Sequence, residues 1–477
     1  MTVSLSLTAG GRPGFGRAID VFHRAAREVP AYREFLARHG IDAESIQTAD
    51  DFASVPATTK ANYLQEFQIP SMLWQGDITQ AGTWSTSSGS TGAPTYWPRD
   101  QVSLQESVEM YDRLFRNSFA SHRRSTLLVV GFALGNWIGG TYTYRAALAL
   151  RKRGHKISII APGINADTIL ANIAELGPHY EQVVIAGYPP FVKDILDRAD
   201  HDVLRQDLKV LLAGENITEE WRDHILARIG KPDKPDQICL IYGTADAGEM
   251  GHETPTTIGI RRLARTDGLL AATLFGADNP LPTFVEFDPQ FRYTEVDANG
   301  RLLFTVDSSL PLIRYQINDE GRVFAPWEVA EALRRCGHQL PVRTSTVGSG
   351  FMVLRRRPDI AASFYAVKLF PESVRAALED SAVRDAVSGK FVLSTETDDA
   401  FGQTLHLRVE LSAAALPSAT LRELLARRVV AALDRTNSEY RQLHATIGAM
   451  AEPVITLDPF GSSRFRYPIK HNYLENK

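Results

Sequence analysis

The sequence predicts an α/β protein: a large N-terminal domain with parallel βαβ sheets and a β-barrel-like subdomain, followed by a small α+β C-terminal domain. Three observations lead to this prediction. Short apolar runs alternate with helical stretches from residue 125 to 241, which is the pattern of βαβ units. After Gly251 the apolar runs continue with few helices between them, and the composition shifts again near residue 355. The 477 residues exceed what one core usually serves, so two or more domains are expected.

The chain begins with a stretch that we interpret as a helical cap on the main domain. Residues 14–40 have a helical pattern that is interrupted at Pro30, because proline ends or restarts a helix. No catalytic chemistry is apparent there. We expect Lys60, in the following segment Val55–Lys60, to be a charge at a helix start rather than a ligand.

A loop rich in serine, threonine and glycine lies in the segment Thr83–Arg99. Its hydroxyls and unhindered backbone N–H groups are those that wrap a polyphosphate, and a predicted helix over Gln101–Phe119 would add a helix N-terminus nearby. No Gly-Lys-Ser/Thr follows, so it is not a Walker A loop. A flexible surface loop remains an alternative. The candidate phosphate-binding residues are Ser87, Ser88, Gly89, Ser90, Thr91 and Gly92.

Five predicted strands of the βαβ region end in loops that carry glycine or polar residues. Since the carboxyl ends of parallel strands share one edge of a sheet, these loops should meet at one ligand-binding crevice. They are Gly131–Trp137, Pro162-Gly163, Tyr188, Gly214-Glu215 and Tyr242–Asp246. The predicted strands are Thr126–Val130, Lys156–Ile160, Gln182–Ala186, Leu208–Ala213 and Gln237–Ile241, and the predicted helices are Thr141–Lys152, Ala166–Leu176, Phe191–Arg198 and a helix that Thr218 caps and that ends at Ile229.

The remainder divides into the strand-rich subdomain and the C-terminal domain. We place the domain boundary between residues 355 and 356, giving domains 1–355 and 356–477. The subdomain is predicted from strands at Leu269–Phe275, Thr283–Phe287, Leu302–Val306 and Leu312–Ile317, with a helix at Trp327–Gly337. The C-terminal domain is predicted from a helix starting at Pro371, a hairpin of Lys390–Ser394 with Thr404–Leu411, and an amphipathic helix at Ser418–Arg435.

Composition excludes several classes of function. The formal net charge of −4 argues against a nucleic-acid or membrane-surface protein. No apolar run approaches a membrane span, and Met1–Arg12 lacks an apolar signal core. Two cysteines, Cys239 and Cys336, cannot form a disulfide framework or a four-ligand zinc cage. We therefore expect a cytoplasmic enzyme.

The order Ser-Ser-Gly-Ser-Thr-Gly-x-Pro at residues 87–94 resembles the phosphate loop of the adenylate-forming enzymes, which include acyl-CoA synthetases, peptide-synthetase adenylation domains and luciferases. Thr95 stands where many members have lysine, and this resembles the phenylacetate-CoA ligase branch. Val29–Arg33, Gly40-Ile41 and Val55–Lys60 resemble the N-terminal lead-in of that branch. The resemblance covers residues 29 to 474.

Three later segments resemble nucleotide-binding motifs of the same family, in the family's order. Gly214-Glu215-Asn216 resembles the turn that packs against adenine. Tyr242-Gly243-Thr244-Ala245-Asp246 resembles a motif whose aromatic residue stacks on adenine and whose acid binds Mg²⁺, with Asp246 in place of glutamate. Pro311–Asp319 resembles the Arg-Tyr-x-x-Gly-Asp motif, whose aspartate binds both ribose hydroxyls. Asn318 replaces the glycine and tolerates a left-handed backbone. The alternatives are a plain strand-to-helix turn for Gly214, a helix N-cap for Asp246 and a turn residue for Asp319.

Two further assignments depend on the position of a residue relative to the family's motifs more than on the type of residue. Arg357-Pro358-Asp359 resembles the hinge between the two domains, with Asp359 at the hinge and Arg357 beside the nucleotide. The family usually carries a catalytic lysine near its C-terminus, and Lys470 is the best candidate by position. A solvated basic segment is the alternative in both cases.

Together these features imply ATP-dependent activation of a carboxylic acid to acyl-AMP, followed by transfer to a thiol, with ATP and Mg²⁺ required and CoA as the expected acceptor. Phe132, Trp137 and Tyr188 offer a flat, apolar lining, so an aromatic or otherwise apolar acid is expected, although core packing would use the same residues. Transfer to a carrier-protein thiol or an amine and an inactive nucleotide sensor remain alternatives. A homodimer is left open.

Overall fold

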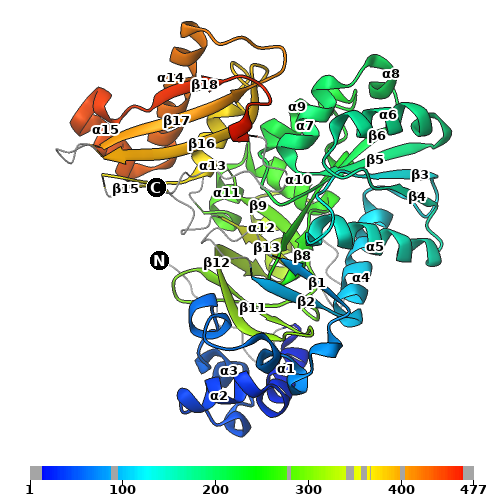
Figure 1. Ribbon diagram of the computed structural model, residues 1–477. Helices are drawn as coiled ribbons and strands as arrows, with labels where there is room; N and C mark the ends of the chain where they lie inside the picture. The colour runs from blue at the N-terminus through cyan, green and yellow to red at the C-terminus, as the bar shows by residue number, and fades with distance from the viewer. Residues whose placement is uncertain are drawn as a thin grey trace.

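The computed structural model describes residues 13–86, 95–276, 281–339, 349–355, 362–365, 367–397 and 403–465. A large sheet of eleven strands runs through the N-terminal part of these residues (Figure 1). Helices cover it, and a separate helix-and-sheet unit follows it in the chain. The predicted α/β fold is confirmed.

The sheet has a parallel half and an antiparallel half. Its strand order is β10-β11-β12-β13-β9-β8-β7-β6-β5-β3-β4, in which β4, β3, β5, β6 and β7 run parallel. The strand-rich segment therefore continues the same sheet at β8. The strands are β3 (Thr126–Val130), β4 (Ile157–Ile160), β5 (Gln182–Gly187), β6 (Leu208–Ala213), β7 (Ile238–Thr244), β8 (Gly248–His252), β9 (Thr283–Phe287), β10 (Tyr293–Val296), β11 (Arg301–Val306), β12 (Leu312–Phe324) and β13 (Gly350–Leu354).

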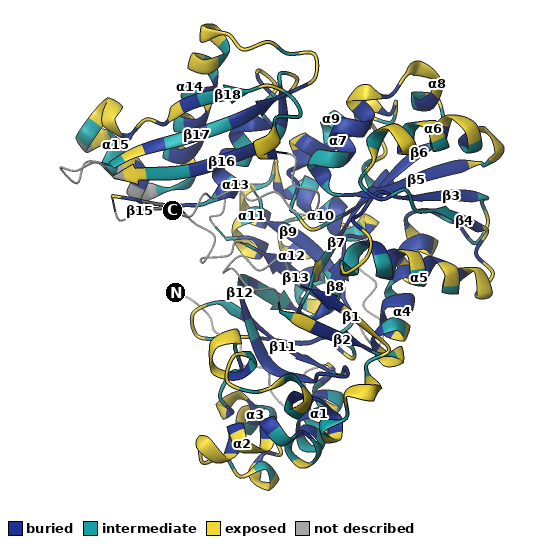
Figure 2. Cartoon of the chain, viewed as in Figure 1, coloured by how far each residue is buried: buried dark blue, intermediate teal, exposed yellow. Residues whose placement is uncertain are grey.

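Helices pack on both faces of the parallel half, as Figure 1 shows. Every residue of β3 and β5 is buried (Figure 2), because a strand covered on both faces has no solvent side to fill with polar residues. One face carries α4 (Gln101–Asn117) and α5 (Ile138–Lys152). The other face carries α6 (Ala166–Leu176), α7 (Pro189–Arg198) and α9 (Glu219–Arg228), with α8 (His201–Leu204) beside them.

The N-terminal helices pack against the antiparallel half and share one apolar core with it. They are α1 (Phe15–Glu28), α2 (Pro30–Arg38) and α3 (Ala49–Ser54). Pro30 is the first residue of α2, so the predicted break is confirmed. A hairpin of β1 (Thr83–Thr86) and β2 (Tyr96–Arg99) follows them. The single-turn elements are η1 (Ala43–Ser45), η2 (Lys60–Leu64, a π-turn), η3 (Ile69–Met72), η4 (Trp74–Gly76), η5 (Ile78–Gln80), η6 (Gly177–His179), η7 (Pro235–Gln237), η8 (Gly448–Ala451) and η9 (Ser463–Phe465).

One predicted strand is wrong. Residues 269–275 lie in and just after a helix, α11 (Gly268–Leu274), instead of a strand. The Asp267 side chain caps this helix by accepting from the backbone N–H groups of Leu269 and Leu270. Leu270 and Leu274, four residues apart, are buried while Leu269 is 63% exposed, which is the burial pattern of a helix. α10 (Pro255–Ala264) and α12 (Pro326–Arg335) pack with α11.

The C-terminal unit has an apolar core of its own, drawn entirely from residues 362–457. It contains helices packed on a sheet of order β16-β17-β18. The division into domains 1–355 and 356–477, and the mobility expected of the second, remain predictions. The elements are β14 (Ala362–Phe364), β15 (Val367–Leu369), α13 (Pro371–Leu378), β16 (Val387–Thr397), β17 (Gln403–Leu411), α14 (Ala419–Thr436), α15 (Ser438–Ile447) and β18 (Val454–Asp458).

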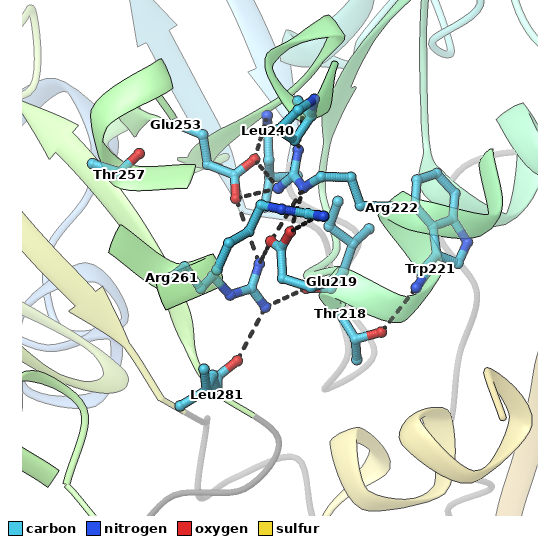
Figure 3. Close-up of polar contacts among 12 residues, drawn as sticks. Thr218, Glu219, Trp221, Arg222, Leu240, Glu253, Thr257, Arg261 and Leu281 are labelled. Carbon is cyan, nitrogen blue, oxygen red and sulfur yellow. Dashed lines mark hydrogen bonds and ion pairs between the residues drawn. The ribbon is translucent and has the colours of Figure 1, made fainter. Parts of the chain in front are cut away.

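A buried network of charges joins α9, α10 and the end of β8 (Figure 3). Arg222, with 0% exposure, donates to Glu253 at 2.7 and 2.8 Å and to Glu219 at 3.1 Å. Arg261 donates to Glu219 at 3.2 Å, and Glu253 accepts from the backbone N–H of Leu240 in β7 at 3.1 Å. The network fixes the start of α9 against β7, next to the edge where the predicted site lies.

Within the described ranges, no helix has both the length and the apolar character needed to cross a bilayer.

Candidate active site

The loops after β3, β5 and β6 meet at the carboxyl edge of the sheet, as predicted. The rings of Phe132 and Tyr188 pack edge to face with centroids 5.2 Å apart. Gly214 has φ of 90°, and a Cβ there would lie 2.8 Å from the ring of Tyr188, so only glycine allows this approach. Burial raises the pKa of Tyr188 to about 12. The predicted acid pocket and adenine turn therefore adjoin.

For Trp137, the third predicted pocket residue, no ring contact with this pair is found. It is the half-buried N-cap residue of α5, and among the described residues its ring stacks on no other aromatic side chain. Gly139, in α5, lies close to both rings. A Cβ built on it would be 3.8 Å from Phe132 and 3.9 Å from the hydroxyl of Tyr188.

The structure brings the second and third nucleotide motifs into direct contact. The hydroxyl of Tyr242, in β7, donates to Oδ2 of Asp319, in β12. These residues are 77 positions apart in the chain. Asn318 has φ of 66°, the left-handed conformation expected for a residue that replaces glycine. A predicted adenine-stacking ring and a predicted ribose-binding carboxylate thus lie side by side.

Asp246 is buried and held by two side chains. The hydroxyl of Tyr315 donates to Oδ2 of Asp246 at 2.7 Å, and Nζ of Lys60 lies 3.6 Å from the same oxygen. Asp246 is 8% exposed, whereas the Lys60 side chain is 45% exposed. Lys60 is therefore a cation at the candidate site, a role that the sequence analysis missed.

The segment before Lys60 positions it. The backbone N–H of Gln316 donates to the carbonyl of Thr58 at 2.9 Å, and the hydroxyl of Thr58 donates to the carbonyl of Ile313 at 2.8 Å. Thr59 then caps the π-turn that begins at Lys60. Lys60 thus starts a helical turn, as expected. Its place beside Asp246 depends on a pairing with β12 that spans more than 250 residues, which no local pattern could reveal.

The hairpin β1–β2, which flanks the predicted phosphate loop, is anchored to the same loops. The backbone N–H of Thr86 donates to the carbonyl of Asn136 at 2.9 Å. Arg99 donates from Nε to Oγ of Ser85 at 3.1 Å and from Nη2 to the carbonyl of Ala245. The predicted residues Ser87, Ser88, Gly89, Ser90, Thr91 and Gly92 lie outside the described residues, as do Arg357, Asp359 and Lys470.

The C-terminal unit contacts the adenine turn. Nη2 of Arg375, in α13, lies 3.3 Å from Oε2 of Glu215. The hydroxyl of Thr218 donates to the carboxyl group of Glu379, while its oxygen accepts from the N–H of Trp221 at 3.1 Å and caps α9, as predicted. Burial raises the pKa of Glu379 to about 7.

The candidate site offers one protein carboxylate, that of Asp246, as a ligand for Mg²⁺. Among the described residues, no group of three or more His, Cys, Asp or Glu side chains could hold a metal ion. Mg²⁺ in nucleotide-dependent enzymes commonly uses one or two carboxylates together with substrate phosphates. Asp246 fits that mode of binding as the single protein carboxylate.

No protein-family model and no curated protein matches the sequence. Solved structures do match. The chain resembles a crystal structure of 2-hydroxyisobutyryl-CoA ligase in its postadenylation state with R3-HIB-AMP, with a TM-score of 0.67 and 16% identity over 97% of this chain and 88% of that one. It resembles the same ligase in its thioesterification state, with 2-HIB-AMP and CoA, with a TM-score of 0.53 and 17% identity over 96% and 88%. The chain therefore has the fold of the adenylate-forming enzymes.

Proposed function

We propose that the protein is an ATP-dependent acid–thiol ligase that forms acyl-AMP and pyrophosphate from a carboxylic acid and ATP, and then transfers the acyl group to a thiol. The observation that carries this proposal is the contact between Tyr242 and Asp319. Two segments that separately resemble nucleotide-binding motifs meet at one edge of a sheet with the adenylate-forming fold.

Each residue has a role that its chemistry suits. Tyr242 presents a flat ring for adenine, and the Asp319 carboxylate accepts hydrogen bonds from the ribose hydroxyls. Gly214 leaves space for the base. A carboxylate oxygen of the acid attacks the α-phosphorus in line, and the bond from that phosphorus to the pyrophosphate oxygen breaks. The main task of the protein is positioning and charge neutralisation.

Asp246 would hold Mg²⁺, which would neutralise charge on the phosphates. The ammonium group of Lys60, exposed beside Asp246, supplies a second positive charge at this end of the site. The acid would extend from the α-phosphate toward Phe132 and Tyr188, where two rings form an apolar wall.

CoA is the proposed acceptor, and a phenylacetate-CoA ligase-like subtype is the proposed branch. The likeness to an acyl-CoA ligase that was solved with CoA supports the acceptor, and Thr95 together with the lead-in Val55–Lys60 supports the branch. The C-terminal unit, proposed to comprise residues 356–477, would move between the two half-reactions.

The test is exchange of labelled pyrophosphate into ATP with a panel of aryl and aliphatic acids. Exchange that requires an acid supports the ligase, whereas nucleotide binding without exchange for any acid would identify an inactive nucleotide sensor. Adding CoA, a carrier-protein thiol or an amine to an exchanging reaction then identifies the acceptor. The control is Tyr242→Ala, which should lose exchange because the adenine platform is removed.

A further inference from the structure

Two buried polar atoms behind the candidate site lack hydrogen-bond partners. Within the described residues, neither Oε2 of Glu249 nor the hydroxyl of Tyr142 is bonded. Burial raises the pKa of both groups. Burying a polar atom without a partner destabilises a protein, and buried groups of this kind are rare in native proteins. A bound group that completes their hydrogen bonds would explain why both are present.

Glu249 belongs to the strand that turns back from the nucleotide motif. In the pairing of β7 with β8 it lies opposite Gly243, and a Cβ on Gly243 would be 3.5 Å from its Cα. Its side chain lies on the face of the sheet that α4 covers, where the hydroxyl of Ser107 lies beside the carboxyl group and lowers its pKa. Glu249 therefore lies in the strand that directly follows the loop carrying Asp246.

Tyr142 approaches the same region from α5. It is one helical turn beyond Gly139, and residues three apart share a helix face. Gly139 adjoins Phe132 and Tyr188. The buried side chain of Tyr142 therefore lies on the same face of α5 as the residue that contacts the proposed acid pocket. Arg99 relates the two groups: its guanidinium carbon lies 6.0 Å from the ring centroid of Tyr142, and its Nη1 would lie 3.9 Å from a Cβ on Gly248, the residue before Glu249. Glu249 also contributes to the raised pKa of Tyr142.

The guanidinium groups around Glu249 bond elsewhere. Arg292 donates from Nε to the backbone carbonyl of Glu249 at 2.9 Å and from Nη1 to Glu106 at 2.5 Å. Arg99 donates to Ser85 and to the carbonyl of Ala245. These bonds hold the backbone of β8 while Oε2 of Glu249 stays unbonded among the described residues.

A cavity reaches the carboxyl group. It has a volume of about 50 Å³ and lies between α4, β8 and residues 286–292. Its lining includes the charged residues Glu249 and Arg292 and the apolar residues Met110 and Phe287. A cavity of this size holds a small polar substituent but not a whole acid, and further charged residues such as Glu106 and Glu286 also line it.

We infer that Glu249 and Tyr142 select acids that carry a hydroxyl or amino group at the end remote from the reacting carboxylate. The substituent donates a hydrogen bond to Oε2 of Glu249, and its own oxygen or nitrogen accepts one from the hydroxyl of Tyr142. This inference rests on the proposed function, because it assigns the far end of the same acid pocket. It narrows the expected substrate from a purely apolar acid to one with a polar tip.

The experiment measures acid-dependent pyrophosphate release for paired acids that differ only at the remote end. Each aryl and aliphatic acid is tested with a hydroxyl, an amino and a methyl substituent. The wild-type protein should prefer the hydroxyl or amino member over the methyl member by about ten- to a hundred-fold in kcat/KM, because the methyl member leaves the buried polar groups without a hydrogen-bond partner. The hydroxyl and amino series separate the two donor chemistries.

Three variants test the assignment. Glu249→Leu and Tyr142→Phe should lose the preference but keep activity with the methyl acids, and Met110→Leu, a control in the same cavity, should keep the preference. The melting temperature of Glu249→Leu is recorded as well, because Glu249 also provides a negative group beside the buried Arg99. A drop in melting temperature with unchanged preference would make Glu249 structural.

The outcomes separate the two proposals. If methyl acids react as well as their hydroxyl and amino partners, the inference is overturned and the ligase stands. If no acid supports pyrophosphate release, the proposed function fails and the inference fails with it. If Glu249→Leu does not fold, Glu249→Gln keeps the side-chain volume, and it should weaken the preference because it replaces one carboxyl oxygen with an NH2 group that cannot accept a hydrogen bond.

Discussion

Raising the pH should loosen the contact between the C-terminal unit and the sheet. Glu379 lies at the end of α13 and bonds to Thr218 across this contact. Burial raises the pKa of its carboxyl group from the ordinary 4.5 to about 7, although Arg375 and Arg261 oppose the rise. The docked arrangement therefore favours the protonated acid, whereas an exposed Glu379 would ionise near pH 4.5.

The size of the effect follows from linkage. At about 1.4 kcal/mol per pKa unit, the difference between 4.5 and about 7 corresponds to about 3 kcal/mol. This contribution is complete below pH 4.5 and is lost as the pH rises to 7, because only the undocked state releases its proton in that range. Separation of the units should thus become on the order of a hundred-fold more favourable between pH 4.5 and pH 7.5.

One neighbouring group acts in the opposite direction. His224 lines the same contact, and burial lowers its pKa. Docking should therefore weaken below pH 6.5 on account of His224, because only the undocked state binds the proton freely. Lys193, Arg384 and Glu215 line the contact as well. The contribution of Glu379 must therefore be isolated by substitution instead of by a pH profile alone.

The assay is energy transfer between dyes on exposed positions of α8 and α14, recorded from pH 4.5 to 8. Glu379→Gln keeps the shape of the side chain and removes its ionisation, so its docking should stay constant where the wild-type protein opens. Glu423→Gln, on the exposed face of α14, is the control and should follow the wild-type profile. If Glu379→Gln and the wild-type protein open over the same range, the reasoning is refuted.

Four further substitutions test the site and the fold. Asp319→Ala should weaken ATP binding by at least ten- to a hundred-fold, because hydrogen bonds to a carboxylate contribute about 1.5–3 kcal/mol each; calorimetry that finds unchanged affinity would exclude ribose binding. Lys60→Ala should slow pyrophosphate release more than Lys60→Arg does, and equal rates would leave Lys60 with only a structural role beside Asp246. Lys470→Ala should depress acyl-AMP formation and spare thioester formation from supplied acyl-AMP, whereas equal loss of both half-reactions would remove Lys470 from the catalytic residues. Arg222→Met should destabilise the protein by about 3–5 kcal/mol, because its buried carboxylate partners lose their counter-charge; a thermal or denaturant melt without this loss would show that the network in Figure 3 is not needed for stability.

Sequence patterns predicted the parts of the fold that depend on local rules. The apolar runs of β3, β5, β6 and β7 are continuous because helices cover both faces. Thr218 caps α9 through its hydroxyl, and Asn318 takes the left-handed backbone that a glycine would otherwise supply. The cap and the turn depend on contacts within a few residues, and a continuous apolar run is itself visible in the sequence, so the sequence is sufficient for all three.

Local patterns failed where distant contacts decide the outcome. A short apolar run such as Leu269–Phe275 fits either a strand or a buried helix, and here the packing of α11 against α10 and α12 decides. Lys60 is ordinary in its own segment and reaches Asp246 only because Thr58 pairs with β12. No sequence pattern indicates Glu249, because the proposed role depends on the absence of a hydrogen-bond partner for its Oε2 among the described residues.

The contact between the C-terminal unit and the adenine turn gives the two parts a physical means of influencing each other. Arg375 pairs with Glu215, one residue from Gly214, and Glu379 bonds to the residue that caps α9. Moving the C-terminal unit must break both contacts and free the turn that would hold the base. If the proposed reaction occurs, docking and nucleotide binding should therefore be coupled, and by reciprocity the ligand that favours the docked arrangement must bind more tightly to it.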